Sequence, residues 1–434
     1  MLRRFSILAP AALLLVTLLS WRQHSLLMES NRRAQDLAAR TWESQPPRFP
    51  LQSISVPWIA PVTISPLALF EPGNGQWLGT AFYLQLGYLA RAQDQLGYDY
   101  FAAGRQSELN PAALLRFLIP VFAIFIAWKH KAAAQRSLIP QIQEMLERVS
   151  PSLALALLLS AILYSNTLGT DGAIRLLLLL SLYLLYSVAA ISITAAGFRF
   201  FSQPSAAAGA VAFFWLFNAS LARPITLNLA SLWVPLPRLE EFLRLLDQET
   251  QNGYLGADPR QDRERRYVAE ALRDYKVKSI QELPVNLSAI LLQREERHQR
   301  EVYNRRLQEL RARFAAQDRI EQLLGFLFPQ VAIEIASASL AATDAPSEHY
   351  QLAAADAHWD RLVTRVYSDL VQSSGPEGLP KSVGPDYWKQ FPRFQSQLPP
   401  IPFSTWQIIL PLSALLAWTA LALGASRKHA GGTE

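Results

Sequence analysis

Four long apolar runs lie almost back to back between Pro111 and Trp233, and they constrain the fold more than any other feature of the sequence. The runs are Ala112–Trp128, Pro151–Tyr164, Ile174–Gly197, and a fourth that begins at Ala206 and ends near Arg223 and Pro224. Runs close to twenty apolar residues match the thickness of a bilayer core. Lipid leaves backbone groups unpaired except in helices or closed barrels, and these runs lack the two-residue alternation of barrel strands. The sequence therefore predicts a membrane helix bundle here.

Each end of the chain adds one more apolar run. Arg3 and Arg4 precede the first run, which ends at Trp21, and the last run covers Trp406–Leu423. The first run could be a signal peptide, but no small-x-small cleavage site follows it, which favours an uncleaved span. The sequence thus predicts six spans: 5–21, 112–128, 150–166, 173–197, 206–223 and 405–424.

Basic residues set one orientation for all six predicted spans. Six lysines and arginines beside the spans agree with a single orientation: Arg3, Arg4, Lys129, Lys131, Arg199 and Arg427. Cytoplasmic loops carry such an excess, so we expect both termini in the cytoplasm of a bacterial cell and a multi-pass protein of its inner membrane. The expected layout is a first span (1–21), an extracytoplasmic segment (22–110), a four-span core (111–235), a second, helical extracytoplasmic segment (236–403), and a last span with its tail (404–434).

The two external segments look soluble, although the mean hydropathy of the whole chain is +0.10. Apolar residues recur at spacings of three and four along 303–324, which predicts an amphipathic helix. The 46–66 stretch is rich in proline, which excludes a long helix there. Neither segment holds a large core alone, so we expect them to pack together, with 46–66 along the apolar stripe. The predicted fold class is an all-α integral membrane protein with a mostly helical external domain formed by two insertions.

No pattern for catalysis occurs in the chain. There is no cysteine, no Walker P-loop, no HExxH and no GxSxG. The net charge of +6 is not concentrated with aromatic residues, which argues against nucleic acid. We therefore expect no catalytic, cofactor-binding or metal-binding residue. Arg116 and Arg175 lie near span ends and are expected to snorkel toward the headgroups. Arg223 with Pro224 indicates a break in the fifth span or a residue of a pathway.

Several local motifs, in their order and spacing, resemble a permease subunit of a type-2 ABC exporter. The resemblance is to the branch with large external domains after the first and fifth spans, whose members are often labelled permease components for multicopper-enzyme maturation. The matching stretches are Ser65-Pro66-Leu67 with Gly79, Glu282–Asn286 continuing to Leu292-Gln293, Gln317-Asp318, and Ala336–Asp344 (ASASLAATD).

This resemblance implies a subunit that couples a separate ABC ATPase, in two copies, to substrate export across the inner membrane. It also implies a second related permease and contact with membrane lipid, while ATP and Mg²⁺ would bind only to the ATPase. An alternative is a non-transporting subunit that transmits ATPase motion to a periplasmic or envelope partner. A membrane scaffold without ATPase is a third.

The resemblance places ATPase docking in the loop between the second and third spans, and the residues there have helical spacing. The candidate docking residues are Gln135, Leu138, Ile139, Ile142, Met145 and Leu146, although Pro140 predicts a break partway. Related permeases usually carry an acidic stretch with Gly-Thr in this loop, and this chain has none. It would then be the degenerate half of an asymmetric pair of permeases.

Overall fold

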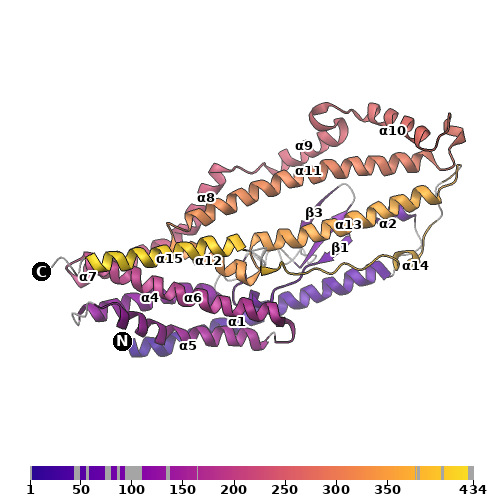
Figure 1. The fold of residues 1–434 in the computed structure, drawn as a ribbon. Coiled ribbons are helices and arrows are strands. Elements are labelled where there is room, and N and C mark those ends of the chain that lie inside the picture. The colour runs from indigo at the N-terminus through magenta and orange to yellow at the C-terminus, as the bar shows by residue number, and fades with distance from the viewer. Residues whose placement is uncertain are drawn as a thin grey trace.

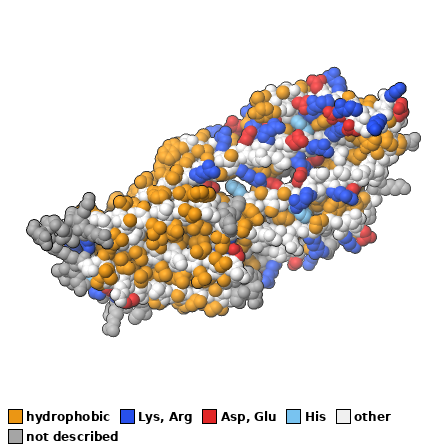
Figure 2. Space-filling view, viewed as in Figure 1, with side chains coloured by type: hydrophobic (Ala, Val, Ile, Leu, Met, Phe, Trp, Pro, Cys, Tyr) orange, Lys and Arg blue, Asp and Glu red, His pale blue; other side chains and the backbone are white. Residues whose placement is uncertain are grey.

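The computed structural model describes residues 2–43, 49–54, 58–73, 80–85, 88–92, 110–132, 137–163, 165–376, 378, 382–401 and 405–428. The molecule is elongated, with a helix bundle at one end and a second helical layer at the other (Figure 1). Helix α1 begins and helix α15 ends at the same end of the molecule (Figure 1). Figure 2 shows hydrophobic side chains over the bundle and charged side chains over the other end. The sequence segments thus separate in space into two kinds of surface.

The bundle consists of the predicted apolar runs and their extensions. Its elements are α1 (Leu2–Glu43), α4 (Pro111–Ala132), α5 (Ile139–Leu163), α6 (Ser165–Phe200), α7 (Pro204–Phe217), the π-helix η2 (Asn218–Ala222), α8 (Arg223–Trp233) and α15 (Thr405–Lys428). Helix α6 lies at the centre and packs against α4, α5, α7 and α15. Asn110 starts α4 by accepting a hydrogen bond from the Ala113 backbone N–H at 2.8 Å.

Five of these helical stretches are long and apolar enough to cross a membrane: Leu8–Arg40, Pro111–Ala132, Gly169–Phe200, Pro204–Trp233 and Thr405–Ala425. They coincide with the first, second, fourth, fifth and sixth predicted spans. The predicted third span, 150–166, falls on α5, whose first part carries Glu144, Glu147 and Arg148 and whose apolar part is short. Six spans therefore remain a prediction, while the chain as a whole is a largely helical membrane protein.

The second part of the molecule combines both segments outside the bundle, and we call it the external domain because it lies outside the bundle. From the first come α2 (Pro50–Ile54), the 3₁₀-helix η1 (Pro66–Leu69), and strands β1 (Trp58–Pro61), β2 (Ala81–Gln85) and β3 (Tyr88–Ala92). The strands form an antiparallel sheet in the order β1-β2-β3, which the all-helical expectation misses. From the second come α9 (Leu239–Asn252), η3 (Tyr254–Gly256), α10 (Arg260–Asp274), η4 (Ile280–Glu282), α11 (Leu287–Leu324), α12 (Pro329–Ala341), α13 (Ala345–Ser373) and α14 (Pro385–Trp388).

One core joins the two segments of this external domain. Ile54, Ala60 and Phe82 of the first segment pack with Trp359 and Trp388 of the second. The apolar stripe of 303–324 forms within α11, as predicted, and α11 packs against α13 and α8. Of the 46–66 stretch expected along this stripe, α2 packs on α13, while 46–48 and 55–57 lie outside the described residues. Asn286 and Asp344 cap the long helices α11 and α13, since each side chain accepts a backbone N–H of the first turn.

Helix α12 belongs to the second external segment in sequence but lies against the bundle in space. It packs on α6 and α15, and Ala332, Ile333 and Ala336 share the bundle core. Figure 1 places it beside α15, at the level where the bundle meets the external domain. A 13-residue apolar helix is too short to be recognised as a span, so the sequence did not predict this position. The junction between the two regions is therefore built around α12.

Candidate functional site

A buried ion pair forms the centre of this junction. Arg116 of α4 donates through Nη1 to Oε2 of Glu71, which follows η1, and both side chains are more than nine-tenths buried. Ser65 positions this turn: it caps η1 by accepting the Leu67 N–H at 3.2 Å, and Pro66 fills the first helical position. The expectation that Arg116 snorkels is wrong, because an acidic partner from the external segment reaches it inside the protein.

Two tyrosines of α6 connect this ion pair to α12. Tyr183 Oη lies 3.5 Å from Arg116 Nη1 and 3.2 Å from Ser337 Oγ. One turn further along α6, Tyr186 donates to Gln330 Oε1 at 3.2 Å. All these groups are buried, and a buried hydroxyl or amide without a partner would be costly. The polar face of α12 is thus specified by its partners on α4 and α6.

The turn after α12 packs against the turn that follows η1. Thr343 Oγ1 donates to the Glu71 backbone carbonyl at 3.0 Å, and Ala342 ends α12 in the left-handed region at φ 55°. Gly73 lies so close that a Cβ added to it would be 2.3 Å from the Thr343 carbonyl oxygen, and its φ is +51°. Only glycine fits both the conformation and the space. Two stretches that carried the resemblance, 65–67 and Ala336–Asp344, therefore meet at this point.

Arg175 makes a second fully buried attachment, and the expectation that it snorkels is also wrong. Its side chain is 1% exposed. It donates to the backbone carbonyls of Leu340 at 3.1 Å and of Pro399, and pairs with Asp171 at 2.6 Å. One arginine near the start of α6 thus holds both the end of α12 and the chain that returns to α15. A guanidinium suits this role because its five donors lie in a fixed plane.

Arg223 makes a third attachment, at the side of the bundle. Its Nη1 lies 2.6 Å from Glu321 Oε2 of α11, and its Nε lies 3.6 Å from Glu334 Oε1 of α12. The helix does not end at Pro224, as a break would require, but passes through the π-helix η2 just before it. A proline removes one α-helical hydrogen bond, and a π-turn next to it accommodates that loss. The predicted break is therefore a local change of helix type that aims Arg223 at the external domain.

Buried carboxyl groups surround the outer face of the junction. Burial, with a smaller contribution from Glu321, raises the pKa of Asp318 to about 7. Burial, with a smaller contribution from Asp344, raises the pKa of Glu348 to about 8. Burial also raises the pKa of Asp344 itself. These acids form no group of three or more metal-binding side chains among the described residues. Burial therefore favours the protonated forms of these carboxyl groups more than water would.

The candidate docking residues lie at the opposite end of the bundle. Leu138 and Met145 are buried, and Ile142 packs against the bundle core, while Ile139 is 75% exposed. Pro140 does not break a helix, because α5 begins at Ile139 and continues to Leu163. Leu146 is partly buried, and Gln135 lies outside the described residues. These residues thus form the first turns of α5 rather than a separate helix, and any docking must use the exposed face next to Ile139.

An ion cluster lies at this end of the bundle, away from the external domain. Glu144 of α5 receives Lys129 Nζ at 2.9 Å, His130 Nε2 at 3.0 Å and Arg148 Nη2 at 2.7 Å. Lys131 donates to the backbone carbonyls of Phe198 and Phe201, at the end of α6. A cation at the last carbonyls of a helix is favourable. The ends of α4 and α6 and the start of α5 are thereby joined into one rigid surface.

The arrangement is suited to holding parts together rather than to bond chemistry. Three arginines of the bundle, Arg116, Arg175 and Arg223, each bind a different part of the external segments. Sequence reasoning missed these pairings because the partners lie far apart in the chain. The signal that was available is a lone arginine in an apolar span, which usually marks a site with an acidic partner.

A comparison with protein families finds one match. Residues 243–397 match a domain of unknown function, DUF3526. The matched region runs from within α9 past α14 and thus covers most of the second external segment, including α12. No curated protein and no solved structure matches the chain.

Proposed function

We propose that this chain is the transmembrane permease subunit of an ATP-driven ABC complex. It would work with a separate ATPase bound at the inner end of the bundle, in a bacterial inner membrane, together with a second related permease. The motifs of 65–67 and 336–344 support this, because they meet at one junction instead of lying scattered over the surface. The chain carries no Walker P-loop, so any use of ATP needs such a partner.

The subunit would transmit the motion of the ATPase to the external domain, and the continuity of α1 supports this most. This helix is 42 residues long, about 63 Å at 1.5 Å per residue, roughly twice the thickness of a bilayer core. Near its outer end Asn31 donates to the carbonyls of Val62 at 2.8 Å and Thr80 at 3.1 Å, beside the sheet. A hydrogen-bonded helix is stiff, so displacement of its inner end moves the sheet.

Export is the second candidate, and one hollow in the bundle favours it. About 350 Å³ lies between α6, α7 and α15, lined by apolar side chains including Phe200, Phe214 and Trp418. Small residues, among them Gly197 and Ala422, leave room there. Such a hollow, within helices apolar enough to cross a membrane, suits an apolar compound taken from the lipid.

Purification of the full chain from its native membranes tests the common part of both candidates. We expect an ABC ATPase to accompany it and the complex to hydrolyse ATP. Ile139→Asp, on the exposed inner face, should reduce this association, while Leu255→Asp, 82% exposed in the external domain, should not. A folded chain that carries no ATPase would contradict the proposal.

A helix break in α1 distinguishes transmission of motion from export. Leu26 is exposed and lies between the bundle and the sheet, and an interior proline disrupts a helix by about 3 kcal/mol. Leu26→Pro should keep the ATPase bound but abolish any ATP-dependent change in labelling of a cysteine at Leu255, while Leu26→Ala should retain it. A nucleotide response that survives Leu26→Pro would argue against α1 as the connection.

A further inference from the structure

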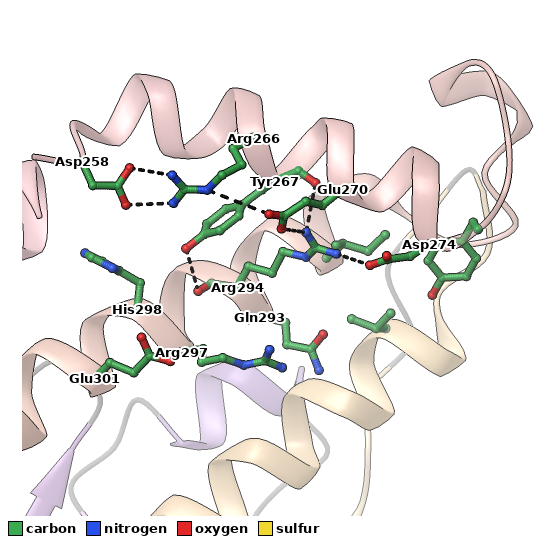
Figure 3. Close-up of a pocket in the computed structure, with 13 residues that line it drawn as sticks. Asp258, Arg266, Tyr267, Glu270, Asp274, Gln293, Arg294, Arg297, His298 and Glu301 are labelled. Carbon is green, nitrogen blue, oxygen red and sulfur yellow. Dashed lines mark hydrogen bonds and ion pairs between the residues drawn. The ribbon is translucent and has the colours of Figure 1, made fainter.

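A polar hollow of about 660 Å³ lies between α10 and α11, at the end of the external domain away from the bundle (Figures 1 and 3). Its floor includes Ile290 of α11 and Val371 of α13, which are both buried. The volume falls in the range of sites that hold small ligands. The hollow takes no part in the junction described above, so it needs its own explanation.

The wall on the α10 side is a continuous row of ion pairs. Asp258 accepts two hydrogen bonds from Arg266, at 3.0 and 2.8 Å. Arg294 reaches across from α11 to Glu270 at 2.6 Å and Asp274 at 2.8 Å. Figure 3 shows these side chains joined in one row. Because these groups use one another, this wall offers few free hydrogen-bonding groups to a ligand.

The wall on the α11 side has polar groups that remain available for hydrogen bonds to a ligand. Gln293 uses its amide nitrogen on Ser368 Oγ at 3.3 Å, which leaves its carbonyl oxygen. His298 Nε2 is buried and has no hydrogen-bond partner among the described residues. Arg297 and Glu301 stand one turn apart, yet no dashed line joins either to another residue drawn in Figure 3. Donors and acceptors thus alternate along one face of α11 and point into the hollow.

The charge around the hollow argues against an ionic ligand. Arg266, Arg294 and Arg297 stand against four carboxylates, those of Asp258, Glu270, Asp274 and Glu301. There is no positive excess to attract an anion. Three of the four carboxylates are already bound to arginine, which leaves Glu301 alone for a cation. The ligand that fits is uncharged and has many groups that both donate and accept.

We propose that this hollow binds an uncharged, hydroxyl-rich ligand of the saccharide class. Sugar hydroxyls donate to Glu301 and the Gln293 carbonyl and accept from Arg297, since each hydroxyl does both. The ring of Tyr275, which follows α10 and is 38% exposed, faces the C–H surface of a sugar ring. The site belongs to the external domain, so the ligand is met on that side of the membrane. This proposal does not depend on the ATPase.

Titration calorimetry of the full chain with uncharged trisaccharides tests it. The probes are maltotriose, cellotriose and N,N′,N″-triacetylchitotriose, and the protein is held in lipid nanodiscs because maltoside detergents would compete. We expect saturable binding of at least one probe. The double variant Arg297→Ala with Glu301→Ala should bind it about tenfold more weakly or worse, through the loss of hydrogen bonds to charged groups.

A matched control separates the site from general effects of surface charge. The control residue is Arg265 of α10. It is exposed, pairs with Asp262 and does not line the hollow. Arg265→Ala should therefore leave the affinity unchanged. Three results would each overturn the proposal: no saturable binding of any probe, equal affinity in the double variant, or binding only of a charged tripeptide used for comparison. The last would assign the hollow to a protein partner.

Discussion

The bundle and the external domain both bury arginine side chains, but the surfaces around these arginines differ. The surface is charged in the external domain and apolar in the bundle. In the external domain Arg263 is fully buried and donates to Glu295 Oε1 at 3.0 Å. It also donates to the backbone carbonyls of Asp258 and Thr250, so that one side chain connects α9, α10 and α11. Charged side chains cover the surface of that domain (Figure 2), and exposed ion pairs such as Arg260–Glu264 and Arg265–Asp262 lie there. In the bundle, Arg116 and Arg175 lie behind a surface of exposed leucine and phenylalanine.

This difference shows where the two regions are tied to each other. A charge in an apolar bundle is expensive unless it is paired, so each buried arginine there has a specific partner. Arg175 has its counter-charge within α6, at Asp171, but the external segments supply Glu71 to Arg116 and the carbonyls of Leu340 and Pro399 to Arg175. Arginines within the external domain hold that domain together, whereas arginines in the bundle hold the two regions together.

The largest effect should come from removing the acidic partner of Arg116. Glu71→Gln leaves a buried guanidinium without its counter-charge, which should cost about 3–5 kcal/mol. Denaturant unfolding in micelles measures it. Glu29→Gln is the matched control, because Glu29 and Arg33 form an exposed pair worth less than about 1 kcal/mol. Equal effects of the two substitutions would mean that the junction pair does not hold the regions together.

A smaller but still clear effect should follow from adding one methyl group at the junction. Gly73→Ala puts a Cβ against the Thr343 carbonyl and forces a positive φ on alanine, at about 2–3 kcal/mol. Gly384→Ala meets no atom within 4 Å and serves as the control. The measurement is the unfolding midpoint of each variant. If alanine at 73 were as harmless as at 384, the close approach of these two turns would be wrong.

The external face of the junction should respond to pH in a definite direction. Burial raises the pKa of Glu348 from 4.5 to about 8, so the folded state favours the protonated form. Stability should therefore be highest below pH 4.5 as far as this group is concerned, and fall as the pH rises toward 8. Glu348→Gln should flatten this fall between pH 5 and 8. Parallel curves for the two proteins would show that Glu348 is solvated.

The smallest effect on stability is expected from Ile139→Asp, at the end of the bundle away from the external domain, with the buried neighbour Leu138 as the contrasting position. Leu138→Asp places a charge in the bundle core and should cost several kcal/mol, whereas Ile139→Asp should change stability by less than about 0.5 kcal/mol. Thermal unfolding compares them directly. A destabilised Ile139→Asp protein would mean that its face is covered, and that no exposed docking surface exists there.

The sequence allowed the bundle to be predicted because long apolar runs report the solvent around them directly. It also allowed the 303–324 part of α11 to be predicted, since Leu307, Leu310 and Phe314 recur at spacings of three and four. Helix α12 could not be placed, because its 13 residues look like any short buried helix. The partners of Arg116 and Arg175 were missed for a different reason. Glu71 and Leu340 lie far away in the chain, and only the packing of α4, α6 and α12 brings them together.

In the proposed arrangement a membrane separates the Ile139 end of the bundle from the external domain, and cysteine labelling tests this directly. The chain has no cysteine of its own, so single cysteines can be introduced at two exposed positions, Leu255 and Ile139. In spheroplasts, a membrane-impermeant maleimide should label Leu255→Cys at once and Ile139→Cys only after the membrane is opened. Equal labelling of both positions before permeabilisation would contradict the assignment of the two regions to opposite sides.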